Sequence, residues 1–429
     1  MDRGDWERVA AIYLPLAIAL LARLLRGKRP RQFAACLLSM LWVLPALLAL
    51  QRLNAAEHWW SFSESAAGLR GMPLELLLGW SFLWGLVPQL VFPDLSIVVS
   101  ATVMVLLDCL LMPLCSASVH LGSWWLLGEA VAVGIVLVPG LCLAQWTLQK
   151  SHLKGRATLQ VITAGMLFLF FIPEVCFAIR PGAGWTPLLQ LPSWARQLGI
   201  QAILVMAIPG VGAVMEFAER GRGTPIPYDP PLRLVTSGIY RYIANPMQVS
   251  CAAVMVAWAG MLRNGGLVVS TILSVAYSAG IANWDEKDDL RQRFGEEWLD
   301  YRSVVRNWFP RWKPYHSGPP ARLYIARTCE PCSRIGAWLQ ARKPLGLKIL
   351  DAESLPAGSI QRMRYEPNDG TPASDGVRAM GRALEHLSLG WAIAGAALRI
   401  PGIWQLVQLL MDASGLGPRL IGDAHCETR

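Results

Sequence analysis

Charged residues are scarce in this chain. Lysine, arginine, aspartate and glutamate together make up only 16% of its 429 residues, whereas about 25% is usual for soluble domains. This shortage argues against an ordinary soluble enzyme, and the 54% of hydrophobic residues points to a membrane protein. The sequence also lacks a repeat of 20 to 50 residues, which argues against a solenoid.

Apolar runs near the ~20 residues that a spanning helix needs recur along the first two thirds of the chain. The long runs are residues 9–26, 32–51, 73–93, 95–116, 124–146, 158–178, 198–218 and 266–284, and a shorter run covers 248–262. We therefore expect a polytopic α-helical membrane protein with about nine transmembrane helices.

The distribution of basic residues predicts how these helices are oriented. The N-terminus lacks the pattern of a cleaved signal peptide, and five basic residues crowd the loop after the first apolar run, namely Arg23, Arg26, Lys28, Arg29 and Arg31. Because short basic loops usually stay cytoplasmic, we expect residues 285–429 in the cytoplasm. The net charge of +9 is then explained by loops that touch anionic lipid, and no nucleic-acid partner is expected.

Two of the acidic residues inside the predicted spans would be especially costly there. Asp108 lies near the middle of one run and Glu174 follows Pro173 in another. A carboxylate inside a bilayer is costly, so both side chains should face the interior of the helix bundle. Either a functional site or a packing role for these two residues fits the sequence.

Composition divides the chain into four parts. Residues 1–195 read as transmembrane helices with short loops, 196–315 combine apolar runs with polar, proline-rich segments, 316–321 read as a linker, and 322–422 read as a soluble α/β unit. In the second part, residues 219–248 are rich in proline, glycine and arginine, so a regular helix is excluded there. An ordered loop of this length tends to be functional.

The second part carries a recognisable pattern. The stretch "GIYRYIANPMQ" (238–248), a helical hairpin and "NWDEKDDLRQRFGEEWLDY" (283–301) resemble the isoprenylcysteine carboxyl methyltransferase and phospholipid methyltransferase superfamily, in its bacterial branch. Motif positions of that family fall on Gly238, Tyr240, Asn245, Pro246, Glu286, Leu290, Phe294, Gly295, Trp298 and Tyr301. The chain departs from the family pattern at Ala244, Gln248, Ser250 and Lys287.

The resemblance implies a site at the cytosolic end of the helices in a bacterial inner membrane. It implies S-adenosylmethionine as cofactor and a membrane lipid or other lipophilic acceptor as partner. The residues expected to bind the cofactor are Gly238, Tyr240, Arg241, Tyr242, Asn245, Pro246, Glu286 and Tyr301, with Glu286 and Asn245 as catalytic candidates. Glu286 or an aromatic ring would face the sulfonium, and Arg241 would face the carboxylate. No metal is expected, because the sequence has no HExxH or similar cluster.

A CxxC pair marks the soluble part. The pair Cys329 and Cys332 follows a predicted strand, "LYIA", and opens a predicted helix that includes "CSRIGAWLQAR", and "GLKILDA" predicts a second strand. This order predicts a thioredoxin-like fold, and residues 322–422 resemble the DCC family of thiol-disulfide oxidoreductases. At a helix N-terminus the dipole favours a thiolate, so Cys329 is the expected attacking thiol and Cys332 the resolving one, acting on a thiol redox partner. Zinc is not expected, since no histidine has ligand spacing.

The sequence thus predicts an S-adenosylmethionine-dependent membrane methyltransferase with an appended thiol-disulfide domain. Two alternatives stay open. A membrane oxidoreductase could use a nicotinamide cofactor, the CxxC pair or both. A non-catalytic membrane scaffold is favoured by Ala244 and Gln248, since tyrosine and arginine at a membrane edge often serve only as anchors, and two cysteines at a helix start need not turn over.

Overall fold

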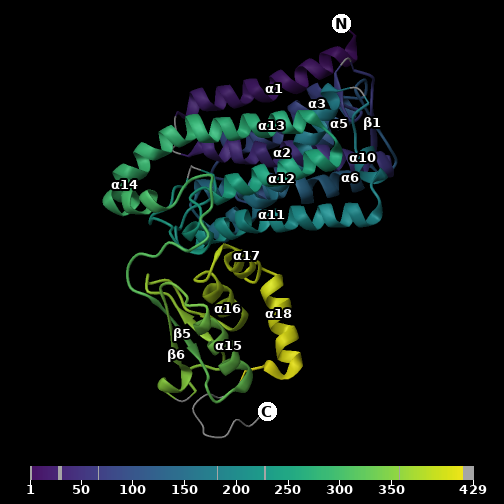
Figure 1. The fold of residues 1–429 in the computed structure, drawn as a ribbon. Helices are drawn as coiled ribbons and strands as arrows, with labels where there is room; N and C mark the ends of the chain where they lie inside the picture. The colour runs from purple at the N-terminus through teal and green to yellow at the C-terminus, as the bar shows by residue number, and fades with distance from the viewer. Residues whose placement is uncertain are drawn as a thin grey trace. The chain divides into compact units, whose positions relative to one another are not determined.

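The computed structural model describes residues 2–27, 31–65, 67–180, 182–226, 229–356 and 358–418, without the side chains of residues 281–286. The chain is mostly helical (Figure 1) and divides into two compact units. The N-terminal unit comprises Met1–Gln190, Ile226–Asp229 and Ala259–Leu267. The C-terminal unit comprises Leu191–Pro225, Pro230–Trp258 and Val268–Arg429.

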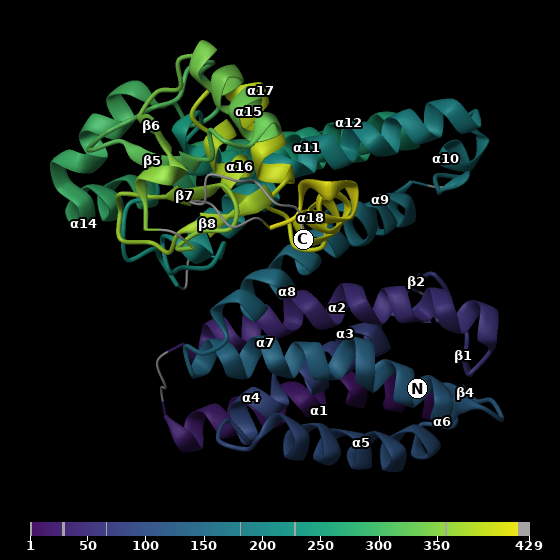
Figure 2. The ribbon, with the colours of Figure 1, turned by 90° about the horizontal axis from the view of Figure 1, so that it is seen from below.

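The N-terminal unit is a helix bundle in which α2 packs against α3, α7 and α8 (Figure 2). Its helices are α1 (Arg3–Arg26), α2 (Gln32–Glu57), α3 (Leu74–Gly85), α4 (Val87–Val91), α5 (Ile97–Leu114), α6 (Trp125–Ala132), α7 (Val138–Leu148), α8 (Leu153–Met166), α9 (Ile172–Ile179) and α10 (Thr186–Gln190). Single π-helical turns join α6 to α7 and α8 to α9. Two short antiparallel pairs, β1 (Trp60–Phe62) with β4 (Val119–Leu121) and β2 (Gly68–Leu69) with β3 (Met72–Pro73), connect helix ends.

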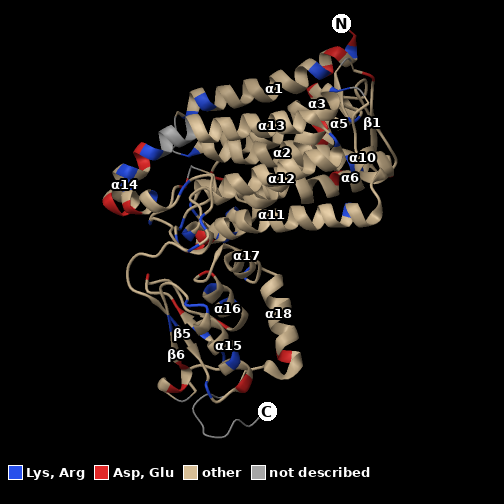
Figure 3. Ribbon diagram, viewed as in Figure 1, with Lys and Arg blue, Asp and Glu red and all other residues tan. Residues whose placement is uncertain are grey.

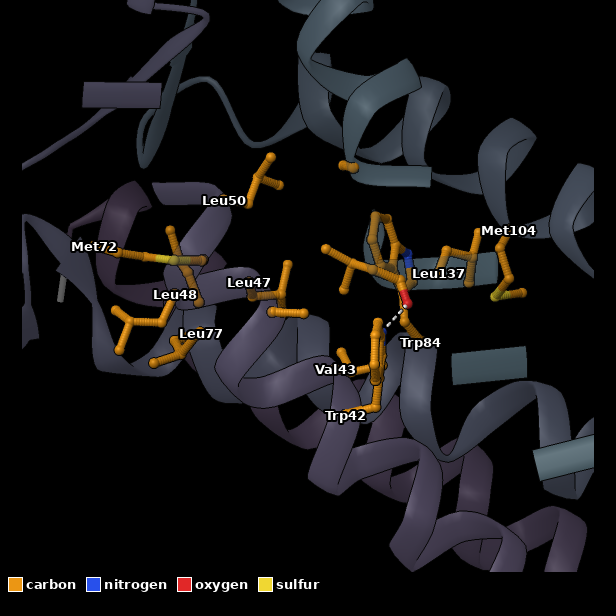
Figure 4. Packing of buried hydrophobic residues seen from close by; sticks show 14 of the residues in the cluster. Trp42, Val43, Leu47, Leu48, Leu50, Met72, Leu77, Trp84, Met104 and Leu137 are labelled. Atoms are coloured by element: carbon orange, nitrogen blue, oxygen red, sulfur yellow. Dashed lines mark hydrogen bonds between the residues drawn. The ribbon is translucent and has the colours of Figure 1, made fainter. Parts of the chain in front are cut away.

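Large aliphatic and tryptophan side chains fill the core of this bundle (Figure 4). Trp42 is buried on α2, and its indole Nε1 donates a hydrogen bond to the backbone oxygen of Val136 at 3.1 Å. That oxygen lies in the π-helical turn between α6 and α7. The polar atom of a buried tryptophan therefore finds a partner where the regular helix is interrupted.

Asp108 and Glu174, the two acidic residues singled out in the predicted spans, lie inside the bundle, as the sequence predicts. Asp108 is fully buried and accepts a hydrogen bond from Trp80 Nε1 at 2.9 Å. Glu174 is fully buried and forms ion pairs with Arg52, at 2.5 Å, and with Arg70. Arginines from elsewhere in the unit thus partner the Glu174 carboxylate, which supports a packing role for that residue.

Seven of the described helical stretches are long and apolar enough to cross a membrane, which is compatible with an integral membrane protein. They are α1, α2, α3 with α4, α5, α6 with α7, α8 with α9, and α11 (Ser193–Glu219). The other two predicted spans correspond to the shorter helices α12 (Pro246–Leu262, 17 residues) and α13 (Gly265–Tyr277, 13 residues). Figure 3 shows that α12 and α13 are nearly free of charge, whereas α14 (Asn283–Val304) is strongly charged.

The membrane-like part of the C-terminal unit is built on α11 and α12, which lie side by side (Figures 1 and 2). Ser250 Oγ on α12 donates to the backbone oxygen of Met206 on α11 at 2.5 Å. Between these helices the described chain is irregular except for a 3-10 turn, η3, at Gly238–Arg241. Helix α14 is broken at Gly295, whose φ of 52° and ψ of −129° lie outside the helical region.

The soluble-like part is a four-stranded mixed sheet with helices. The strand order is β6 (Leu347–Asp351), β5 (Ala321–Ile325), β7 (Arg364–Glu366) and β8 (Ser374–Asp375), with β5 and β6 parallel and the other pairs antiparallel. Its helices are α15 (Glu330–Ala341), α16 (Gly376–Leu384), α17 (Leu389–Ala397) and α18 (Ile403–Met411). The predicted order of strand, CxxC, helix and strand is present as β5, the CxxC pair, α15 and β6.

Candidate functional site

Backbone hydrogen bonds bring the two halves of the sequence motif together. Asn245 N donates to the backbone oxygen of Asn307 at 3.3 Å, and the neighbouring Ala244 N donates to Arg306 O at 2.9 Å. The hydroxyl of Tyr301 on α14 donates to the backbone oxygen of Tyr240 at 2.8 Å. The end of α14 and the chain after it therefore fix the irregular segment that precedes α12.

The two halves line a pocket of about 90 Å³ that is partly open to solvent. Its walls come from the end of α11, the irregular segment and α14: Phe217, Pro231, Leu234, Val235, Tyr240, Ala244, Asn245, Lys287, Leu290, Phe294, Trp298, Tyr301, Arg302 and Asn307.

Three of the predicted cofactor-binding residues, Tyr240, Asn245 and Tyr301, line this pocket. The motif residues Leu290, Phe294 and Trp298 line it as well. Four other predicted cofactor-binding residues do not line this pocket, namely Gly238, Arg241, Tyr242 and Pro246. The side chain of Glu286 lies outside the described residues.

The described lining is aromatic and cationic. Phe294, Trp298 and Tyr240 supply ring surfaces, and Lys287 and Arg302 supply positive charge. Burial raises the pKa of the Tyr301 phenol, so at neutral pH the hydroxyl stays neutral and keeps its hydrogen bond to Tyr240. Such a pocket can bind a planar ring by stacking and a carboxylate by ion pairing.

Gly238 occupies a position that no other residue fits easily. Its φ is +61°, and a β-carbon there would fall 2.5 Å from Cγ of Glu216. Glu216 lies near the end of α11, fully buried, and accepts a hydrogen bond from Ser237 Oγ at 2.6 Å. Gly238 therefore lets the η3 turn pack directly against this carboxylate, which positions Tyr240 two residues later.

Glu216 belongs to a buried network that joins α11 to α16 and α17. Arg382 and Arg399 both bind its Oε1, and Arg399 does so at 2.5 Å. Glu385 forms an ion pair with Arg399, also at 2.5 Å. For Arg382, burial alone would lower the pKa, but the carboxylates of Glu216, Glu385 and Glu219 outweigh it and raise the net pKa. The arginine therefore stays charged.

Tyr242 connects the motif segment to the same helices. It is fully buried, and its hydroxyl donates to the backbone oxygen of Glu385 at 2.9 Å. Burial raises the pKa of this phenol. Gly212 allows α17 to approach α11, because a β-carbon at Gly212 would lie 2.9 Å from Cβ of Ala396. Tyr242, predicted to bind cofactor, thus fixes the segment to the C-terminal helices.

The CxxC pair starts α15, as the sequence predicts. Cys329 is the N-cap residue and is buried, Pro331 lies in the first turn, and Cys332 is partly exposed. Glu353 Oε1 accepts hydrogen bonds from Arg327 N at 2.8 Å and from Thr328 N at 3.0 Å. Burial would raise the pKa of Glu353, but these hydrogen bonds outweigh it and lower the net pKa. A carboxylate therefore holds the loop before Cys329.

Sequence reasoning missed the buried partners of the motif. Glu216 lies near the end of the predicted apolar run 198–218, and Glu353 follows the second predicted strand with no motif around it. For Glu216 the sequence did hold one signal: a carboxylate inside an apolar run is costly and requires a partner. No described group of three or more histidine, cysteine, aspartate or glutamate side chains could hold a metal ion.

Comparisons with known proteins found no related protein. The chain matches no protein-family model, no curated protein and no solved structure. The functional conclusion therefore depends on the geometry of the pocket and of the CxxC pair.

Proposed function

We propose that this protein is an integral membrane methyltransferase that uses S-adenosylmethionine and acts on a lipid or small lipophilic acceptor. The observation that carries the proposal is the pocket in which Tyr240 and Asn245 meet Phe294, Trp298 and Tyr301 of α14. Tyr240 and Asn245 lie more than 40 positions before the α14 residues in the sequence. Both stretches that carry the family resemblance therefore contribute to one pocket.

The described side chains suit the proposed cofactor. Aromatic rings attract a sulfonium through the ring face and stack on adenine. Lys287 or Arg302 can pair with the carboxylate of the methionyl group, and the amide of Asn245 or Asn307 can bond the ribose or the base. When bound, S-adenosylmethionine supplies an electrophilic methyl group. The protein contributes orientation of the acceptor and exclusion of water.

The position of the pocket suits a lipophilic acceptor. Its lining includes Phe217 near the end of the apolar helix α11 and Asn245 immediately before the apolar helix α12. An acceptor dissolved in the bilayer could approach along these helices. The orientation with this end in the cytoplasm of a bacterial inner membrane, and nine spans in total, belong to the same proposal.

Ligand-dependent stability tests the proposal. Full-length protein purified in detergent is heated with S-adenosylhomocysteine or with NADPH. A rise of the melting temperature with S-adenosylhomocysteine supports the methyltransferase, because a ligand that binds only the folded state stabilises it. A rise with NADPH alone would favour the membrane oxidoreductase, and no rise with either would favour the non-catalytic scaffold.

A second activity, thiol-disulfide exchange, is favoured by the placement of Cys329 at the N-terminus of α15. In this reaction the two thiols of the pair are oxidised to a disulfide, and the disulfide of a partner is reduced to two thiols. Cys329, as the N-cap residue of α15, is the thiol proposed to attack first. Because Cys329 is buried, the reaction requires that the partner's disulfide gain access to it.

A further inference from the structure

A second pocket in the C-terminal unit carries a charge that no described residue balances. It is lined by Arg220, Thr236, Ser237, Arg241, Tyr315, His316, Ser317, Pro319, Ala321, Gly346, Tyr365, Pro367, Asn368 and Asp369. Its volume is about 110 Å³, and it is partly open to solvent. None of these residues lines the proposed cofactor pocket.

Arg241 is the key residue of this second pocket. Its side chain is 8% exposed, and Nη1 donates to the backbone oxygen of Tyr315 at 3.1 Å. Its buried Nε has no hydrogen-bond partner among the described residues. A buried guanidinium usually binds a carboxylate or phosphate with its planar fork of donors. One donor of the Arg241 fork is therefore unsatisfied in the described structure.

Neighbouring arginines have their charge compensated by carboxylates, whereas, among the described residues, Arg241 does not. Arg220, Arg378, Arg382 and Arg399 share the carboxylates of Glu216, Glu219, Glu385 and Asp369. Over the ranges that the structure describes, Arg241 takes part in none of these ion pairs. Since an uncompensated buried charge is costly, the pocket is built for an anion.

The other walls can serve the same anion. His316 has a pKa lowered by burial and by the charge of Arg241, so at neutral pH its neutral ring can donate a hydrogen bond without adding charge. Gly346, with φ +70°, lets this ring pack closely, since a β-carbon there would lie 2.4 Å from Nδ1. Hydroxyl groups of Thr236 and Ser317 line the pocket as well.

We propose that this pocket binds a phosphoryl group, held by the guanidinium of Arg241. A phosphoryl group offers three acceptor oxygens and up to two negative charges, which suit a fork of donors beside hydroxyl groups. The pocket lies where two apolar helices end or begin, because Arg220 directly follows α11 and Arg241 comes five residues before α12. A lipid headgroup phosphate and a soluble phosphate share this chemistry.

The test uses the full-length protein in detergent and measures the melting temperature. The probes are inorganic phosphate and dihexanoyl phosphatidate, each compared with chloride at equal ionic strength. We expect both to stabilise the wild type. A larger shift with the phosphatidate than with phosphate at equal concentration identifies a lipid headgroup, and equal shifts identify a soluble phosphate. No shift above chloride with either probe would overturn the proposal.

Two variants assign the shift to this pocket. Arg241→Gln should lose the phosphate-induced shift and keep the shift caused by S-adenosylhomocysteine, which separates this proposal from the cofactor site. Asn368→Asp, at an exposed position of the lining, should weaken phosphate binding at least about tenfold, because it places a like charge in the pocket. The control Arg334→Gln removes an exposed arginine of α15 and should change nothing. A phosphate shift that survives in both pocket variants would contradict the assignment.

Discussion

Gly238 lies directly against the side chain of Glu216, so close that a β-carbon at Gly238 would fall 2.5 Å from Cγ of the glutamate. Through this contact the buried network of α11, α16 and α17 fixes the η3 turn, and with it Tyr240 in the wall of the proposed cofactor pocket. The contact explains in physical terms why a predicted cofactor-binding glycine lies outside that pocket.

Replacing Glu216 should destabilise the protein strongly. Glu216→Gln removes the charge that Arg382 and Arg399 share, and breaking a buried ion pair in this way costs about 3–5 kcal/mol. Unfolding by denaturant in detergent measures the loss. The matched control is Glu297→Gln, an exposed glutamate of α14, which should leave the midpoint unchanged. Equal midpoints for Glu216→Gln and wild type would contradict a central role for the network.

The same contact predicts a second, milder effect. Gly238→Ala must hold an alanine at φ +61°, which costs about 1–2 kcal/mol for the left-handed conformation alone, and the Glu216 side chain must also shift. We expect a lower denaturation midpoint and weaker binding of S-adenosylhomocysteine. Gly260→Ala, in open space on α12, is the matched control. If Gly238→Ala is as stable as Gly260→Ala, the close contact between Gly238 and Glu216 does not contribute to the free energy of unfolding.

Tyr301 ties α14 to the motif segment, and its hydroxyl can be removed alone. Tyr301→Phe leaves the buried backbone oxygen of Tyr240 without its donor, which costs about 1–3 kcal/mol. S-adenosylhomocysteine should then bind roughly tenfold more weakly, as isothermal titration would measure. Tyr277→Phe, an exposed tyrosine of α13, serves as control. If both variants bind like the wild type, the link between Tyr301 and Tyr240 does not shape the pocket.

Sequence reasoning singled out "GIYRYIANPMQ" and the stretch around Phe294 by their spacing, and residues of both stretches line one pocket. It also located β5, α15 and β6 around the CxxC pair. It could not predict the contacts of Arg241 and Tyr242, because adjacent side chains in a segment without a regular period contact different partners. It likewise missed Glu216, whose role depends on arginines about 170 positions away. Such pairings arise only from tertiary packing.

His386 gives the C-terminal unit a predictable pH dependence. The ring is fully buried, with Nδ1 bonded to Leu345 O at 2.7 Å and Nε2 to the Tyr365 hydroxyl at 3.0 Å. Burial, followed by the charge of Arg241, lowers its pKa well below the usual 6.5. Well above pH 6.5 the ring is neutral in both states. As the pH falls through 6.5 only the unfolded chain takes up the proton, so the free energy of unfolding falls by about 1 kcal/mol between pH 6.5 and 5.5, and by about 1.4 kcal/mol per pH unit below that.

Denaturation between pH 6.5 and 5.5 checks this prediction. His386→Gln should show a flatter dependence of stability on pH than the wild type, whatever its stability at pH 7. His120→Gln, which replaces an exposed histidine, should keep the wild-type slope. Identical slopes in all three proteins would mean that another group controls the stability in this range.

The CxxC pair is tested by reduction of a fluorescent disulfide probe, with dithiothreitol as the electron donor. Cys329→Ser should lower the rate to background, and Cys332→Ser should accumulate a mixed disulfide with the probe, because the resolving thiol is gone. Cys251→Ser, a cysteine of α12, is the control and should keep the wild-type rate. Wild-type turnover by Cys329→Ser would exclude Cys329 as the attacking thiol.

Direct binding of labelled S-adenosylmethionine tests the central proposal most sharply. Equilibrium dialysis of the full-length protein in detergent should show saturable binding that excess S-adenosylhomocysteine abolishes. Ala244→Phe, which places a large ring in the pocket wall, should eliminate the binding and leave the melting temperature of the free protein near that of the wild type. Absence of saturable binding to the wild type, or undiminished binding to a folded Ala244→Phe, would contradict a cofactor site between Tyr240, Asn245 and α14.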